Sequence, residues 1–239
     1  MHSPHLASRP ARRGHASGRT IVLAALVSLA ATPALAAEED FQSWLSATGT
    51  TAISPKIDAT MEAHFRFYDD ASYLGQLLLR PSLTYKLEGG WSLSGGYAYA
   101  RTDPGSADVS HEHRAWEQVG YRFVGDERLT ITGRTRLEQR FVEGRDGTGW
   151  RVRQQVRAAF TSSGAGKVQA VAWNETFYSL NDTVFGQRAG FDQTRTFIGA
   201  SLPLARGTTI EPGYLNHRTF REGPDRVNHI LAVNLFTRF

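Results

Sequence analysis

Apolar and polar residues alternate along most of this 239-residue chain, and they do so in long runs. Between positions 57 and 67 the odd residues are apolar, while the even residues are polar or charged. The runs 77–87, 129–141 and 150–160 repeat this period of two. Because successive side chains of a β-strand point to opposite faces, each run predicts a strand with one apolar and one polar face.

Weaker runs show the same alternation, at 41–53, 91–102, 113–124, 168–178, 193–204, 208–217 and 228–239. Short connections rich in Gly, Pro, Ser or Asp separate some of the runs, at 54–56, 88–90, 125–127, 162–167 and 206–207. Longer polar connections separate the others, at 69–75, 103–112, 143–149, 179–191 and 218–227. Short turns at one end and long loops at the other are typical of an up-and-down membrane barrel.

The runs therefore predict one all-β domain, a transmembrane up-and-down antiparallel β-barrel of 10–12 strands. The runs number eleven, whereas single-chain bacterial barrels have even numbers of strands. We therefore expect ten or twelve strands. We expect the error to lie in the N-terminal run, which contains Phe41 and Trp44.

A soluble periplasmic barrel would also alternate, with its apolar face inward, so other features must decide. The runs are about eleven residues long, which is the length that a tilted strand needs to cross a bilayer. Aromatic residues near the run ends predict the girdles of a membrane barrel: Phe65, Phe67, Trp91, Tyr97, Tyr99, Tyr121, Phe123, Phe141, Trp150 and Phe160. The last apolar row closes on Phe239, which resembles the signal read by barrel-assembly machinery. These features favour the membrane barrel.

The first 36 residues have the composition of a cleavable signal peptide. Four Arg and no acidic residue precede the mainly apolar run 21–31, and Ala34-Leu35-Ala36 matches the small-x-small pattern of a cleavage site. The apolar run is too short for a transmembrane helix. We expect Sec-type export, a mature barrel over 37–239, and a location in the outer membrane of a Gram-negative-type cell.

Charge and cysteine content narrow the partners. The chain has 27 Lys and Arg against 23 Asp and Glu, and the expected leader contains four of the Arg, so 23 of each sign remain. Nucleic-acid binding therefore loses its support. There is no Cys, which excludes disulfides, thiolate nucleophiles and Cys-based zinc sites. The expected partners are outer-membrane lipids and, during export, periplasmic chaperones and the barrel-assembly machinery.

Short motifs carry a family resemblance. Positions 190–195 read Gly-Phe-Asp-Gln-Thr-Arg and positions 213–217 read Gly-Tyr-Leu-Asn-His. With Trp44, the run 62–66 and Trp173-Asn174-Glu175, they resemble the outer-membrane β-barrel family called domain of unknown function 2490. The motifs depart from the family pattern at two places, where Thr194 stands for Asn and His217 for Gln. The resemblance implies an outer-membrane barrel and supplies no activity.

Charged residues gather on the faces predicted to line the lumen. They are Glu62, Arg80, Arg114, Arg122, Arg134, Arg136, Glu138, Arg140, Arg151, Arg153, Arg157, Glu175, Arg195 and Glu211. An Arg-rich lumen can act as an anion-preferring pore. Alternatively, Arg–carboxylate pairs can close the limited interior of a small barrel, and this second interpretation is the one we favour.

Catalytic and metal chemistry find little support. His111-Glu112-His113 is a weak metal pattern, so we expect solvated loop residues and no metal or cofactor. His229, beside Asn228, is the first candidate if the protein hydrolyses lipid. We expect a non-enzymatic barrel, either a narrow, porin-like channel for small solutes or a mainly structural component. An outer-membrane lipid-modifying enzyme is the alternative.

Overall fold

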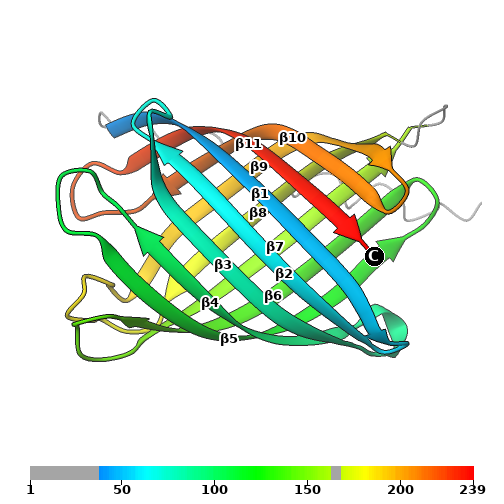
Figure 1. Cartoon of the computed structure of the whole chain (residues 1–239), viewed down its shortest axis with the longest axis horizontal. Coiled ribbons are helices and arrows are strands. Elements are labelled where there is room, and N and C mark those ends of the chain that lie inside the picture. Colours follow the sequence, from blue (N-terminus) through cyan, green and yellow to red (C-terminus); the bar gives the residue numbers. More distant parts are fainter. Residues whose placement is uncertain (1–37, 163–167) are drawn as a thin grey trace, which may run out of the picture. The chain divides into compact units, whose positions relative to one another are not determined.

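The computed structural model describes residues 38–162 and 168–239, which form a closed β-barrel (Figure 1). Each long alternating run of the sequence has become one strand. The eleven strands of these described residues are β1 (Glu38–Ser54), β2 (Ile57–Tyr68), β3 (Tyr73–Lys86), β4 (Ser92–Thr102), β5 (Ser110–Gly125), β6 (Leu129–Val142), β7 (Gly149–Thr161), β8 (Gln169–Ser179), β9 (Gly190–Ala205), β10 (Thr208–Thr219) and β11 (Arg226–Arg238).

The predicted fold class, an up-and-down antiparallel barrel of 10–12 strands, is confirmed, but the count is odd and the expectation of an even number, ten or twelve, is wrong. Neighbouring strands run antiparallel around the barrel until β1 meets β11, where the two strands run parallel. An odd number of up-and-down strands makes such a parallel seam necessary. The N-terminal run is a full strand, because it pairs with β2 on one side and with β11 on the other from Glu38↔Arg226 to Thr50↔Arg238.

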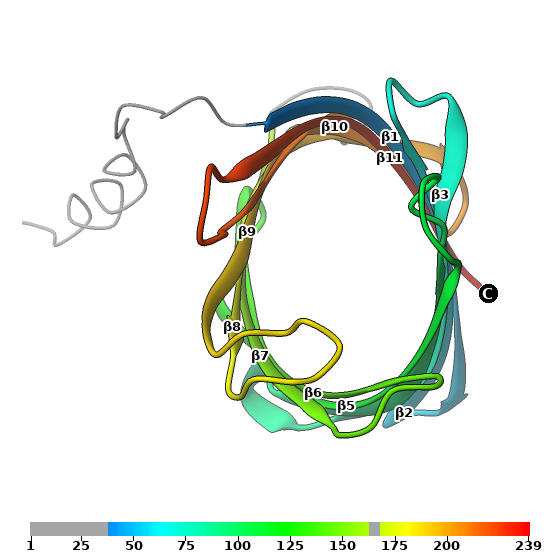
Figure 2. The same cartoon turned by 90° about the vertical axis from the view of Figure 1, so that its left-hand side faces the viewer.

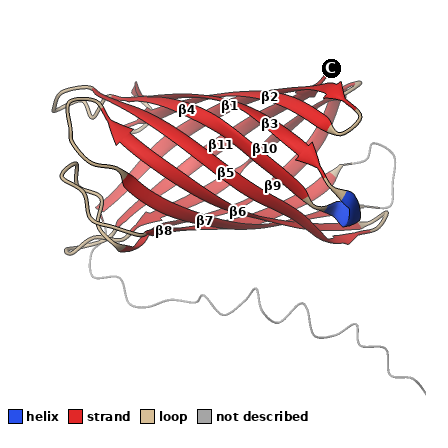
Figure 3. Cartoon of the chain, turned by 90° about the horizontal axis from the view of Figure 1, so that it is seen from below, coloured by secondary structure: helices blue, strands red, loops and turns tan. Residues whose placement is uncertain are grey.

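Short and long connections lie at opposite ends of the barrel (Figure 3). The short-turn end contains residues 55–56 and 206–207, and also the single-turn 3-10 helix η2 (Glu88–Gly90). The long-loop end contains the connections that follow β2, β4, β6, β8 and β10. The longest of these loops is residues 180–189. This is the predicted alternation. Part of the expected turn 162–167 and the expected signal peptide 1–36 lie outside the described residues.

Apolar side chains cover the outer surface of the barrel, and polar ones point inward. Leu83 is 54 % exposed and Ile198 is 64 % exposed, whereas Glu138 is only 2 % exposed. A soluble barrel would bury its apolar face, so the arrangement is that of a barrel surrounded by lipid. The described residues contain no helix that is long and apolar enough to cross a membrane.

Candidate functional site

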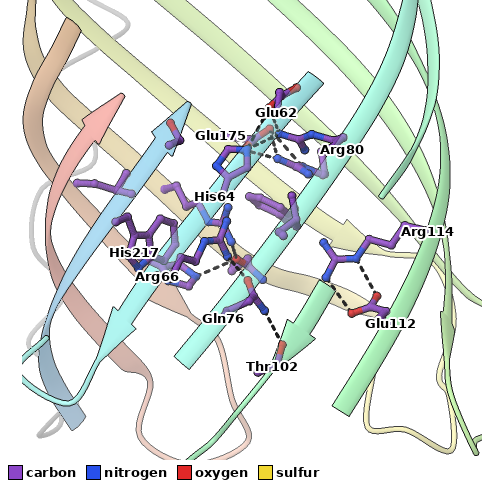
Figure 4. Close-up of a pocket in the computed structure, with 18 of the residues that line it drawn as sticks. Glu62, His64, Arg66, Gln76, Arg80, Thr102, Glu112, Arg114, Glu175 and His217 are labelled. Atoms are coloured by element: carbon purple, nitrogen blue, oxygen red, sulfur yellow. Dashed lines mark hydrogen bonds and ion pairs between the residues drawn. The ribbon is translucent and has the colours of Figure 1, made fainter. Parts of the chain in front are cut away.

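A polar cavity of about 930 Å³ lies inside the barrel (Figure 4). Its walls come from strands all around the sheet and from the loops at the long-loop end. Of the predicted lumen residues, those at this wall are Glu62, Arg80, Arg114, Arg134, Arg140, Arg151, Arg153, Arg157, Glu175, Arg195 and Glu211. Alternation along single strands therefore located most of the Arg and Glu residues of the wall.

The three other predicted lumen residues lie elsewhere. Arg136 and Glu138 are each 2 % exposed and are buried beside the cavity wall, where Arg136 binds Gln118 and stacks on Trp116. Arg122 is exposed at the end of β5, next to a register shift in the β5–β6 pairing, and it does not line the cavity. The expectation for Arg122 is thus corrected: its strand leaves regular pairing there.

On one side of the lumen, β6, β7 and β8 form a network of buried charges. Arg153 donates from Nη1 to Glu138 Oε1 at 2.6 Å and from Nη2 to both carboxylate oxygens of Glu175 at 2.8 Å. Arg151 donates from Nε and Nη2 to Glu138 Oε2, and Arg134 donates from Nη2 to Glu175 Oε1. We call these five residues the ion-pair wall. Two buried carboxylates hold three guanidinium groups here.

A third carboxylate, Glu112 of β5, binds Arg114 of the same strand and Arg140 of β6. Arg114 donates from Nε and Nη2 to its two oxygens at 2.9 and 2.8 Å, and Arg140 does the same at 2.5 and 3.1 Å. Such two-point contacts are the strongest form of this pair. Glu112 is absent from the predicted lumen residues because the sequence pattern predicts a loop at this position.

The segment 111–113 is in fact the start of β5, so the expectation of loop residues is wrong. Because side chains of a strand alternate between its faces, Glu112 points inward while His111 and His113 point outward. Their Nδ1 atoms contact the hydroxyl groups of Tyr99 and Tyr97, respectively. The described residues contain no group of three or more His, Cys, Asp or Glu that could hold a metal ion.

Smaller ion pairs fill the remaining parts of the lumen. Arg157 donates to Glu211 at 2.6 Å, and Arg80 donates to Glu62, which also contacts His64. Near the short-turn end Asp58 binds Lys86 and Arg238, and these three side chains lie outside the cavity wall.

Two other Arg of the lumen, on β2 and β9, form no ion pair with a carboxylate among the described residues, although Arg195 lies opposite Glu175 in the β8–β9 pairing. Arg66 of β2 donates from Nη1 to the amide oxygen of Gln76 at 2.7 Å, and Arg195 of β9 donates from Nη2 to the amide oxygen of Gln193 at 2.8 Å. The Nε atoms of both Arg are buried without a hydrogen-bond partner in the described part of the chain. We call Arg66 and Arg195 the cation pair.

Trp44 of β1 brings the cation pair together. The guanidinium carbons lie 3.9 Å (Arg66) and 5.0 Å (Arg195) from the centroid of its ring, so they are at most about 9 Å apart. At that separation two positive charges repel by about 2 kcal/mol at an effective dielectric constant of 20. Figure 4 shows Arg66 held by Gln76, which in turn binds Thr102. The cation pair is therefore fixed in place by neutral groups.

His217 completes this side of the cavity without adding a negative charge. Its ring packs edge-on against Trp44 at 5.5 Å, and its nitrogens contact the Gln193 oxygen at 2.8 Å and Asn228 at 3.3 Å. These contacts suit the neutral ring, in which Nε2 donates to Gln193 and Nδ1 accepts from Asn228. Arg66 continues the polar row of its strand, and that alternation is the signal that could have assigned it to the lumen, whereas the row of His217 includes Gly213 and Leu215 and gives no such signal.

The loop 180–189 reaches over the opening at the long-loop end (Figure 2). Gln187 anchors it: the side-chain oxygen accepts a bond from Arg140, and the nitrogen donates to the backbone oxygens of Trp150 and Asn181. Phe185 of this loop lines the cavity. The loop therefore narrows the mouth of the cavity.

His229, the candidate for catalysis, points outward rather than into the lumen. Its Nδ1 lies 2.7 Å from the Tyr214 hydroxyl and its Nε2 lies 4.0 Å from a carboxylate oxygen of Glu39. Among the described residues its hydrogen-bond partners do not include a serine. His229 thus has a partner, but not one that resembles an activated serine.

Two solved structures have a partly similar fold. The β-domain of the Bordetella autotransporter BrkA is 12 % identical, with a TM-score of 0.43 and coverage of 72 % of this chain and 78 % of that one. LpxR from Salmonella typhimurium is 8 % identical, with a TM-score of 0.49 and coverage of 75 % of this chain and 83 % of that one. Values this low say nothing about activity.

Comparisons at the level of sequence give stronger matches than the comparison of structures. An uncharacterised protein of Methylorubrum extorquens is 35 % identical over 226 residues, which are 92 % of this chain and 98 % of the relative. A family model described as "Protein of unknown function (DUF2490)" matches residues 41–228, from β1 into β11. The chain therefore belongs to this family, whose model spans the barrel almost from end to end.

Proposed function

We propose that the protein is an outer-membrane barrel that admits small anions through its lumen, as a narrow anion-preferring channel. One observation carries this proposal. Among the described residues the cavity wall contains ten Arg and four Glu. Rings of Arg favour anions in a pore, because they offer the charge that replaces lost hydration.

The excess of Arg argues against a dry, purely structural interior. A buried charge that lacks a partner costs several kcal/mol, so closed protein interiors pair their charges. The ion-pair wall follows that rule, but the cation pair does not. Water and anions inside the lumen would supply the missing compensation. We therefore prefer the channel to a mainly structural role.

The proposed location rests on the outward apolar face and on the N-terminal sequence. Export by the Sec route, removal of residues 1–36 and insertion by the barrel-assembly machinery would deliver the barrel to the outer membrane. Phe239 is 83 % exposed at the end of the chain, where an assembly signal would be accessible. N-terminal sequencing of protein extracted from membranes should find Ala37 first.

The direct test is conductance of the refolded barrel in a planar bilayer. In a KCl gradient the reversal potential should have the sign of chloride preference. A folded sample that never conducts would support the structural role, and a preference for potassium would contradict the proposal.

The same sample also tests the enzymatic alternative. Hydrolysis of phospholipid should be absent, because His229 contacts Tyr214 and not a serine. If hydrolysis is detected, the matched variant His229→Ala decides whether this outward histidine is responsible.

A further inference from the structure

The cation pair has more hydrogen-bonding capacity than the protein uses. A guanidinium has five N–H donors, and in the described structure Arg66 and Arg195 each direct one hydrogen bond to an amide oxygen. Arg153 differs, because its three nitrogens all donate to carboxylates. The Nε atoms of the cation pair are buried, so the unused donors available to a ligand are those of the Nη atoms.

The position of the cation pair suits a solute that enters the lumen. Arg66, Arg195 and His217 all line the cavity, so the unused Nη donors of the two Arg border its open space. Trp44 contacts both guanidinium groups through its ring. Gln76 and Gln193 hold them through neutral oxygens, which leaves both guanidinium groups without a direct ion pair in the described structure.

We infer that Arg66 and Arg195 form a binding site for one small oxyanion, a phosphate or a carboxylate. The inference rests on the proposed function and names the chemical class of its solute. Planar guanidinium groups match the oxygen spacing of carboxylate and phosphate, and two of them can hold one such group from two sides. The ligand is a soluble anion rather than a lipid headgroup, because the site faces the lumen and not the lipid.

The site can be tested without measuring transport. Inorganic phosphate is titrated calorimetrically into the refolded mature barrel, in micelles that contain no phospholipid and at low ionic strength. Wild-type protein should bind one phosphate per barrel. Arg66→Gln and Arg195→Gln should each weaken binding by about tenfold or more, the value for losing one charged hydrogen-bonding partner. Acetate should compete with phosphate for the site.

Lys86→Gln is the matched control, because it removes an inward positive charge that lies outside the cavity wall. Its affinity for phosphate should stay within about twofold of wild type. Saturable binding that survives in the double variant Arg66→Gln, Arg195→Gln would overturn the inference, as would folded wild-type protein that binds no phosphate.

The phosphate-binding test and the conductance test check two different claims, so each claim can be contradicted without the other. A barrel that conducts anions but shows no phosphate site would contradict this inference alone. A barrel that binds phosphate at the cation pair but does not conduct would contradict the channel and leave the binding site standing.

Discussion

Arg153 and Arg66 both point into the lumen, yet their surroundings differ in kind. Arg153 lies between Glu138 and Glu175, and all three of its nitrogens donate to carboxylate oxygens. Arg66 meets one amide oxygen and the face of an indole ring. The first arrangement stabilises the sheet through paired charges, and the second leaves positive charge at the edge of a cavity. The same residue type therefore contributes structure on one wall and a site for solutes on the other.

The largest effect should come from breaking the ion-pair wall. Glu138→Gln removes the carboxylate shared by Arg151 and Arg153 and leaves two buried charges with less compensation. The free energy of unfolding should fall by about 3–5 kcal/mol, which is typical of a broken buried pair. Denaturant unfolding in lipid vesicles measures this loss.

The matched control is the same substitution on the outer face. Glu117 is exposed and contacts Gln139 only at 3.4 Å, so Glu117→Gln should cost little or no stability. Equal losses in the two variants would mean that the ion-pair wall stabilises nothing of its own.

The ion-pair wall and the cation pair both face the lumen, so the other face of each strand should meet lipid. A charge placed on that outer face tests this orientation. Leu79→Arg, at the middle of β3, should weaken the barrel by about 2–4 kcal/mol. Leu87→Arg, beyond the end of the same strand, should cost about 1 kcal/mol or less, because it lies near the interface. The measurement is unfolding in vesicles, and equal costs at the two depths would show that this face does not meet lipid.

A smaller effect is expected when the cation pair loses one charge. Arg66→Gln removes the cation–π contact with Trp44, which lowers stability, and relieves the repulsion from Arg195, which raises it. The free energy of unfolding should therefore change by less than about 1 kcal/mol. A loss as large as that of Glu138→Gln would mean that Arg66 is a structural residue and would remove the contrast between the walls.

Alternation along the sequence is sufficient to predict the strands, but it does not predict how the first and last strands close the barrel. The period of two at 57–67 and 129–141 predicts β2 and β6 within about a residue. The preference for even strand numbers then gave the wrong count, because a parallel seam between β1 and β11 depends on pairing at opposite ends of the chain. Register between distant strands is not encoded in local alternation.

The site was predictable as a row of residues but not as a set of partners. Alternation predicts that Arg195 faces the lumen, but it does not predict that Arg195 binds Gln193 while Glu175, its register partner on β8, binds other Arg. Arg151 binds Asp192, which is 41 positions away. Glu112 is absent from the predicted lumen residues because the alternating run begins at His113, whereas β5 begins at Ser110. Pairing in a barrel depends on stagger around the sheet, and short-range pattern does not give it.

The reversal potential of the double variant Arg66→Glu, Arg195→Glu tests the central claim most directly. If the cation pair sets the preference for anions, wild-type barrels in a KCl gradient should favour chloride and the double variant should shift clearly toward potassium. Arg122→Glu is the control, because this exposed arginine lies outside the cavity wall and should leave selectivity close to wild type. Unchanged chloride preference in a folded, conducting double variant would contradict the claim that the cation pair governs what the lumen admits.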